Sequence, residues 1–225
     1  LPEERGLYKK MKVGEQLLYL ARLKGLKKDE AMEKLKEWFI KFDIKTWWDK
    51  NVEDLSKGMQ QKIQFVATVL HQPKLIILDE PFSGFDPINA NLIKDEILEL
   101  KEKGSTIIFS THRMESVEEL CDYIALINKS KKVLEGKKSD IKQQFKPNTF
   151  SMDYTGLLDS SGHTYSIQNS STNLDGTVSS VIKASAGFES NDILKEIVEK
   201  VKIISFKEDL ASMNDVFMKA VKNSN

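Results

Sequence analysis

The sequence has little cysteine, no excess of either charge and no long apolar run. Among its 225 residues Cys121 is the single cysteine, which excludes an intramolecular disulfide and fits a reducing, cytoplasmic compartment. Lys plus Arg and Asp plus Glu both total 34, so no basic excess indicates nucleic-acid binding. No apolar run reaches the ~18 residues of a membrane-spanning helix. The 40% hydrophobic content is ordinary for a globular protein with a real core.

The sequence also lacks the phosphate-binding motif Gly-x-x-x-x-Gly-Lys-Ser/Thr. It does not begin with methionine, and residues 1–5 do not resemble a signal peptide. We therefore expect the chain to begin within a domain.

Apolar periodicity predicts helices in the first part of the chain. Residues 14–42 have the spacing of two amphipathic helices separated near Gly25, and Trp47 and Trp48 are interpreted as packing residues. A further helix begins after Asp54 or Ser56, either of which can cap it, and continues to about Leu70.

The next segment predicts a parallel sheet. The aliphatic residues 75–78 are typical of a strand buried on both faces. A helix from about residue 88 to 103 and a second strand at 105–111 follow. Strand, helix and strand in this order predict a crossover unit with parallel strands.

The remaining sequence predicts smaller elements. A short helix at 114–120 precedes a hairpin formed by 123–127 and 132–136. After Pro147 the composition becomes rich in Ser, Thr, Asn and Gly, and we expect residues 146–225 to form a small α+β domain. Its predicted strands are 149–154, 164–168, 178–184 and 201–206, and its predicted helices are 191–200 and 213–221.

Two adjacent carboxylates end the first predicted strand. Asp79 and Glu80 would lie at the carboxyl edge of the sheet, where open α/β sheets bind ligands. Asp79 can serve Mg²⁺, and Glu80 can polarise a water that attacks a γ-phosphate. The alternative, a strand that ends in a polar loop, is equally compatible with these two residues. His112 at the end of the neighbouring strand favours the site, because parallel strands would bring it near Glu80.

The second candidate site is the helix start at residues 55–62. Ser56 and Gly58 precede backbone N–H groups that can bind an anion, and glycine permits close approach of a phosphate. On spacing alone, an ordinary capped helix is favoured over a binding site.

Taken together, these motifs resemble the ATP-binding cassette family over roughly residues 1–140. Residues 55–60 resemble the family signature Leu-Ser-Gly-Gly-Gln, residues 75–79 the Walker B strand, residues 83–86 the D-loop, and His112 the switch histidine. The tail resembles a C-terminal domain appended to bacterial exporter ATPases of the sodium-extrusion and multidrug types.

The resemblance implies the fold and its boundaries. We expect a partial P-loop NTPase-like (RecA-like) α/β core at residues 1–145 without the Walker A motif, with a helical subdomain at about 14–55, followed by the accessory domain at 146–225. Three positions depart from the family pattern: Glu3 replaces the Q-loop glutamine, and Lys57 and Met59 stand within the signature.

The resemblance also implies roles for residues. Glu80 would be the catalytic base and His112 the γ-phosphate sensor. Asp79 would bind Mg²⁺, with Glu3 as a possible second ligand. The other expected ATP-binding residues are Ser56, Lys57, Gly58, Met59, Asp86 and Glu3.

The implied function is ATP hydrolysis coupled to export. Two cassettes, identical or different, would sandwich ATP head to tail and act on a separate membrane-spanning permease at the cytoplasmic face of the membrane. We expect no nucleic-acid partner, and we expect this stretch alone to be inactive because it lacks Walker A. Two alternatives are a soluble cassette ATPase and a non-catalytic partner subunit.

Overall fold

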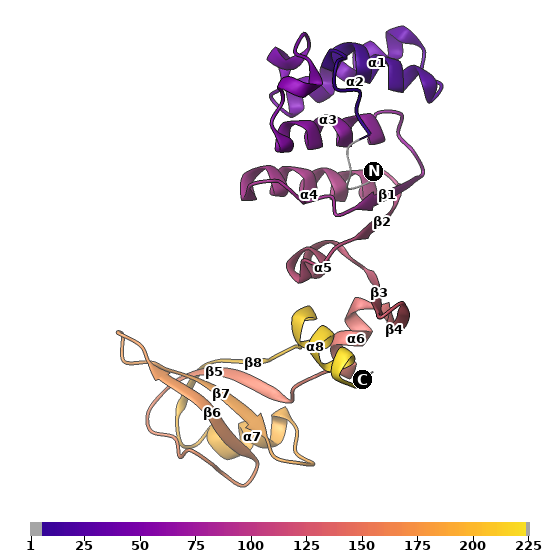
Figure 1. Cartoon of the computed structure of the whole chain (residues 1–225). Coiled ribbons are helices and arrows are strands. Elements are labelled where there is room, and N and C mark those ends of the chain that lie inside the picture. The colour runs from indigo at the N-terminus through magenta and orange to yellow at the C-terminus, as the bar shows by residue number, and fades with distance from the viewer. Residues whose placement is uncertain (1–5, 224–225) are drawn as a thin grey trace. The chain divides into compact units, whose positions relative to one another are not determined.

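The computed structural model of the chain describes residues 6–223 and forms two compact units, Leu1–Arg113 and Met114–Asn225. The first unit contains helices and a pair of parallel strands (Figure 1). The second unit contains a hairpin, a four-stranded antiparallel sheet and further helices. The predicted α/β class is confirmed, and the C-terminal part, predicted as α+β, combines a four-stranded sheet with helices.

The first unit begins with helices whose apolar faces pack together. They are α1 (Val13–Leu23), α2 (Lys28–Lys41) and α3 (Lys57–Val69), with the 3-10 turns η1 (Lys45–Trp47) and η2 (Val52–Asp54) between α2 and α3. Leu17 and Ala21 of the predicted apolar group are buried together with Val13 on one face of α1, whereas Leu23 is 66% exposed. The two helices predicted within 14–42 are therefore confirmed.

Aromatic side chains fill the space between these helices. The ring of Trp38 lies 5.1 Å from that of Phe42 and 6.2 Å from that of Phe65 in α3. Trp48 lies 5.3 Å from Phe39, so its predicted packing role is confirmed. Trp48 also explains why residue 14 is a glycine, because a Cβ atom at Gly14 would lie 2.3 Å from the indole ring of Trp48.

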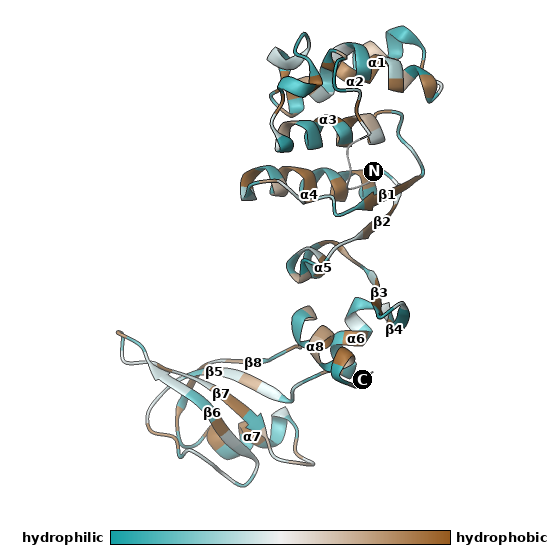
Figure 2. Ribbon diagram, in the orientation of Figure 1, coloured by the Kyte–Doolittle hydropathy of each residue, from teal (hydrophilic) through white to brown (hydrophobic). Residues whose placement is uncertain are grey.

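A parallel pair of strands follows. β1 (Leu75–Asp79) pairs with β2 (Thr106–Ser110) in a register that sets Asp79 opposite Ser110, and α4 (Pro87–Glu102) connects them. Figure 2 shows apolar and polar patches alternating along α4, as expected for a helix with one buried face. Gly104, at φ +95°, follows the end of this helix.

The prediction that β1 is buried on both faces is wrong for the described residues. Ile76 and Leu78 are buried, whereas Leu75 and Ile77 are 51% and 57% exposed. Side chains alternate between the two faces of a strand, and this sheet has two strands. Packing within the described part of the chain therefore covers one face, and the aliphatic residues of the other face contact solvent.

An ion-pair network ties α2 to α4. Lys41 lies 2.6 Å from the buried Glu96 and 2.5 Å from Glu99, which also pairs with Lys103 at 2.5 Å. Burial raises the pKa of Glu96. Hydrogen bonds from Lys103 and Lys41 lower the pKa of Glu99 to about 2. Lys41 thus supplies the cation that the buried carboxylate needs.

The second unit opens with α5 (Met114–Leu120) and the antiparallel hairpin β3 (Tyr123–Asn128) and β4 (Lys131–Lys137), all of which were predicted. Helix α6 (Lys138–Gln144) was not predicted. The sheet that follows has the strand order β6-β7-β5-β8. Its strands are β5 (Thr149–Thr155), β6 (Tyr165–Thr172), β7 (Val178–Ala184) and β8 (Lys202–Glu208), and the remaining helices are α7 (Ser190–Ile197) and α8 (Met213–Asn223).

Two apolar clusters organise this unit. One joins the sheet to α7 through buried residues that include Phe150, Tyr165, Ile193 and Ile197. The other joins α8 to α6 and α5. The last helix therefore packs on residues that precede 145. The domain boundary expected at residues 145/146 stays a prediction.

Candidate functional site

The end of β1 carries the first candidate cluster, which we call the strand-end cluster: Asp79, Glu80, Ser110, Thr111 and His112. The backbone N–H of Glu80 donates to the carbonyl of Ser110 at 3.1 Å, which continues the parallel pairing by one residue. Glu80 has φ +41°, which is uncommon for a residue with a side chain. Such strained positions concentrate at functional sites.

His112 lies directly beside Glu80, as the sheet topology predicted. Its Nδ1 atom is 2.7 Å from Oε1 of Glu80, and its backbone N–H donates to the same oxygen at 2.9 Å. An ionised carboxylate only accepts hydrogen bonds, so Nδ1 carries the hydrogen and Nε2 points elsewhere. The His112 side chain is 80% exposed and that of Glu80 only 17%. The imidazole of His112 can therefore contact a ligand, whereas the carboxylate of Glu80 is mostly buried and is fixed by its hydrogen bonds.

Two hydroxyl groups complete the strand-end cluster. Thr111 donates through Oγ1 to Oε2 of Glu80 at 3.2 Å, and Ser110 donates through Oγ to Oδ1 of Asp79. The sequence analysis did not single out either residue. The predicted parallel pairing was the available signal, because it aligns the end of the second strand with Asp79 and Glu80.

Asp79 offers an exposed carboxylate to a cation. Among residues 6–223, no group of three or more His, Cys, Asp or Glu side chains could hold a metal ion alone. Mg²⁺ prefers one or two carboxylates together with water and substrate phosphates. The residues at this strand end therefore fit Mg²⁺ that arrives with a nucleotide. Glu3, the other expected ligand, lies outside the described residues.

The start of α3 carries the second cluster, which we call the helix-start cluster: residues 56–59 together with 83–86. Ser56 caps α3 by accepting a hydrogen bond from the N–H of Met59 at 3.3 Å, whereas Asp54 belongs to η2. Lys57 is exposed and Gly58 partly so. Such a helix start presents N–H groups and a positive dipole end to an anion.

The expected D-loop segment packs against this helix start. A Cβ atom at Gly58 would lie 3.4 Å from the carbonyl oxygen of Gly84 and 3.7 Å from the ring of Phe85. The structure thus brings the signature-like and D-loop-like segments together. Sequence spacing alone did not predict that contact.

Asp86 caps α4. Its Oδ1 accepts from the N–H groups of Ile88 and Asn89, each at 3.0 Å, and Asn89 also donates through Nδ2 at 2.5 Å. Hydrogen bonds from Asn89 lower the pKa of this carboxyl group. Both oxygens of Asp86 therefore accept hydrogen bonds from the first turn of α4. The expected contact of Asp86 with nucleotide stays a prediction.

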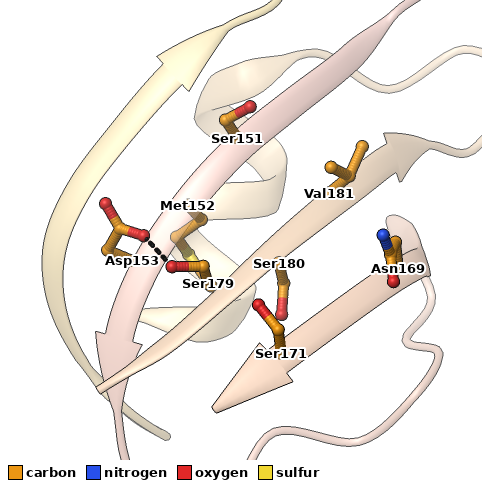
Figure 3. A pocket seen from close by; sticks show the side chains of 8 residues that line it. All are labelled: Ser151, Met152, Asp153, Asn169, Ser171, Ser179, Ser180 and Val181. Carbon is orange, nitrogen blue, oxygen red and sulfur yellow. Dashed lines mark hydrogen bonds between the residues drawn. The ribbon is translucent and has the colours of Figure 1, made fainter. Parts of the chain in front are cut away.

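A shallow hollow of about 170 Å³ lies in the second unit, on the four-stranded sheet (Figure 3). Asp153 accepts hydrogen bonds there from Ser179 at 2.6 Å and from Ser205 at 2.7 Å, which lower the pKa of its carboxyl group. The hollow contains none of the predicted site residues. Its lining is Ser151, Met152, Asp153, Asn169, Ser171, Ser179, Ser180 and Val181.

Comparisons with known families match both ends of the chain. The profile described as ABC transporter matches residues 1–83. The profile described as ATP-binding protein DrrA1-3-like, C-terminal domain, matches residues 136–221. The first match includes the Asp79–Glu80 strand end and the helix-start segment, and the second includes the four-stranded sheet.

Individual relatives agree with these matches. The uncharacterized ABC transporter ATP-binding protein YhaQ of Bacillus subtilis (strain 168) is 57% identical over 145 residues, which are 64% of this chain and 49% of YhaQ. The fluoroquinolones export ATP-binding protein MT2762 of Mycobacterium tuberculosis (strain CDC 1551 / Oshkosh) is 38% identical over 120 residues, 53% of this chain and 38% of that protein. The chain thus spans about half the length of the curated relatives it matches, or less.

A solved structure shares the fold. The structure titled "Structure of ATP binding subunit of ABC transporter" is 32% identical, with a TM-score of 0.60, over 64% of this chain and 60% of that one. Within residues 6–223, no helix combines the length and the apolar character needed to cross a membrane.

Proposed function

Because this chain is a member of the ABC transporter ATP-binding family, we propose that it is part of a subunit that hydrolyses ATP to drive export through a separate membrane protein. One observation carries the proposal: Glu80 and His112 are hydrogen-bonded at the carboxyl edge of a parallel sheet. A structural polar loop does not require a strained glutamate with an exposed histidine on it.

In the proposed reaction, Glu80 acts as the general base. A carboxylate has about four acceptor positions, and hydrogen bonds from His112 and Thr111 occupy three of those of Glu80. The remaining position can accept a proton from water. The water oxygen then bonds to the γ-phosphorus, the bond from that phosphorus to the β,γ-bridging oxygen breaks, and ADP leaves with the bridging oxygen. The hydrogen bonds orient Glu80 toward a single water.

The exposed imidazole of His112 fits a sensor of the γ-phosphate. With Nδ1 directed at Glu80, the Nε2 edge is available to the transferred phosphoryl group. We propose that His112 holds that group in line with the water. Loss of the γ-phosphate after hydrolysis would remove its partner and loosen the cluster.

Asp79 is the proposed protein ligand, direct or through water, for Mg²⁺. The bound ion would neutralise charge on the β- and γ-phosphate oxygens. The Ser110 hydroxyl donates a hydrogen bond to Oδ1 of Asp79. The other oxygen of Asp79, Oδ2, would then bind the ion or its water. Glu3 is proposed as a further contact to the nucleotide or its metal.

The helix-start cluster is proposed to bind the nucleotide held by a second cassette. Ser56, Gly58 and the first-turn N–H groups of α3 would contact its γ-phosphate, with Lys57 adding positive charge and Met59 packing beside it. The adjacent loop at 83–86, including Asp86, would meet the partner at the same place. Two subunits, identical or different, would then sandwich two ATP molecules head to tail.

Coupling to export is proposed through the helical part of the first unit. Residues 14–55 would contact the permease at the cytoplasmic face of the membrane, where the subunit would be a peripheral protein. The relative from Mycobacterium tuberculosis is named a fluoroquinolones export ATP-binding protein, which supports export as the direction of transport. We propose no nucleic-acid partner.

The experiment that tests the proposal measures phosphate release by the natural full-length protein and by its Glu80→Gln variant. Glutamine keeps the size of the side chain and removes the base, so we expect turnover to fall about 10²- to 10⁴-fold. Glu115→Gln, an exposed position on α5, is the matched control and should keep the wild-type rate. Equal rates for Glu80→Gln and the control contradict the proposal.

A further inference from the structure

The junction between η2 and α3 consists of Leu55 and Ser56, both with extended backbone. Its one backbone bond to η2 runs from the Leu55 N–H to the carbonyl of Val52 at 3.2 Å. Each residue of such a junction has two soft dihedral angles, and small changes in them rotate the start of α3 relative to η2. The position of Ser56 in the helix-start cluster therefore depends on contacts that hold this junction.

The side chain of Gln60 folds back over the junction and supplies such contacts. Its Nε2 atom donates to the carbonyl oxygen of Leu55 at 3.0 Å and to that of Val52 at 3.1 Å. A side-chain amide carries two N–H hydrogens, so each carbonyl receives one. The direction follows from helix geometry, because side chains of an α-helix tilt toward its N-terminus. The backbone N–H of Gln60 also donates to the carbonyl of Ser56 at 2.9 Å, so one residue links η2, the junction and α3.

The turn η2 is a fixed base for this link. The N–H of Val52 donates to the carbonyl of Met11 at 3.1 Å, and that of Glu53 donates to the carbonyl of Lys9 at 3.0 Å. The side chain of Val52 is buried. The backbone at 52–53 is therefore held on the segment at 9–11.

That segment is held in turn by α1. Gln16 in α1 is fully buried, its Oε1 accepts the N–H of Tyr8 at 2.9 Å, and its Nε2 donates to the carbonyl of Tyr8 at 3.3 Å. The same carbonyl accepts the N–H of Met11 at 3.1 Å. A continuous set of hydrogen bonds within the first unit thus runs from α1 through 8–11 and η2 to the amide of Gln60.

We propose that Gln60 is a positioning residue for the helix-start cluster. Its two side-chain hydrogen bonds hold the start of α3 on η2, so that Ser56 and Gly58 are placed to receive the γ-phosphate of the nucleotide on a second cassette. Without these bonds, only a fraction of the molecules present the cluster in this arrangement, and the apparent affinity between ATP-loaded subunits falls by that fraction. This inference rests on the proposed function of the helix-start cluster.

The test uses the natural full-length protein with Gln60→Met and Gln60→Glu. Methionine keeps the length of an unbranched side chain and removes both donors, whereas glutamate keeps the shape and sets a carboxylate against the two carbonyl oxygens. The matched controls are Gln143→Met and Gln143→Glu, at an exposed position of α6.

Three quantities are measured: the affinity of the monomer for ATP, ATP-dependent dimerisation by sedimentation, and ATP turnover at several protein concentrations. For Gln60→Met we expect dimerisation to weaken about 3- to 10-fold, with a larger loss for Gln60→Glu. The affinity of the monomer for ATP should stay unchanged, because the cluster serves the nucleotide of the other subunit. Turnover by Gln60→Met should fall at low protein concentration and recover as the concentration rises.

The outcomes separate this inference from the function it rests on. If the wild type dimerises with ATP and Gln60→Met dimerises as well as Gln143→Met, the inference is wrong and the proposed function stands. An equal loss of ATP affinity in the Gln60→Met monomer also contradicts it, because the defect then extends beyond the helix-start cluster. If the wild type shows neither ATP-dependent dimerisation nor turnover, both the proposed function and the inference fail. If Gln60→Glu does not fold, Gln60→Met decides, and loss of folding in both variants contradicts a role in positioning alone.

Discussion

His112 and Glu80 are joined twice, because Nδ1 and the backbone N–H of His112 both reach the same oxygen, Oε1 of Glu80. The backbone bond fixes where the histidine lies. The ring bond fixes which nitrogen faces outward. A single glutamate thus determines both the position and the tautomer of an exposed imidazole.

Replacing His112 by alanine removes the ring bond and keeps the backbone bond. We expect kcat for ATP in the natural protein to fall about 10- to 100-fold. Folding should be little changed because the imidazole is 80% exposed. Steady-state phosphate release and the thermal midpoint are the measurements. A wild-type kcat in this variant contradicts a role for the histidine in turnover.

A substitution at Gly58 distinguishes an effect on stability from an effect on ATP-dependent dimerisation. A Cβ atom at this position would contact Gly84 O at 3.4 Å, an ordinary distance, so Gly58→Ala should leave stability unchanged or slightly higher. A phosphate that approaches the backbone of α3 would meet the added methyl group. We therefore expect weaker ATP-dependent dimerisation with a thermal midpoint that is unchanged or slightly higher. Normal dimerisation in sedimentation experiments contradicts the phosphate contact at this helix start.

Gly14 tests the packing of the helical part. A Cβ atom here would lie 2.3 Å from the ring of Trp48, which also packs on Phe39. Gly14→Ala should therefore lower the free energy of unfolding by about 1–3 kcal/mol despite the better helix propensity of alanine. Urea denaturation measures this, with Glu15→Ala as the exposed control. Combining Gly14→Ala with Trp48→Leu should recover part of the loss, and no recovery contradicts the proposed clash.

Glu196 gives the second unit a pH-dependent stability. Hydrogen bonds from the Thr164 hydroxyl at 2.6 Å, the Thr164 N–H and the His163 N–H lower its pKa from 4.5 to about 2. The pKa of Glu196 is lower in the folded state than in the unfolded state. The stabilisation from its ionised carboxylate is therefore fully present above about pH 4.5 and is lost as pH falls toward 2.

Glu196→Gln should therefore flatten that part of the stability curve. The difference in urea midpoint between the wild type and the variant should shrink as pH falls from about 5 to 3. A difference that stays constant over this range shows that Glu196 contributes nothing through its charge.

Periodicity was sufficient to predict the order of most elements, and the exceptions have physical causes. Helix α6 was missed because Ile141 is its only buried residue among polar neighbours, which leaves no apolar repeat. The exposure of Leu75 and Ile77 was missed because a run of aliphatic residues carries no information on which face is covered.

The site was predictable where topology determines it. Two parallel strands bring Glu80 and His112 together, so their contact followed from the strand order. The hydroxyl groups of Ser110 and Thr111 gave no motif of their own. In the second unit, the hydrogen bond from the Met213 N–H to Glu118 joins residues 95 positions apart, and no local pattern contains that information.

The most direct test of the central claim is the identity of the nucleotide that Glu80→Gln retains. The natural protein carrying this substitution is incubated with Mg²⁺ and ATP, separated from free nucleotide, and the bound nucleotide is analysed. If Glu80 is the base, the protein retains intact ATP as a stable dimer while wild type releases ADP and phosphate. Recovery of ADP from the variant, formed at the wild-type rate, contradicts the role assigned to Glu80.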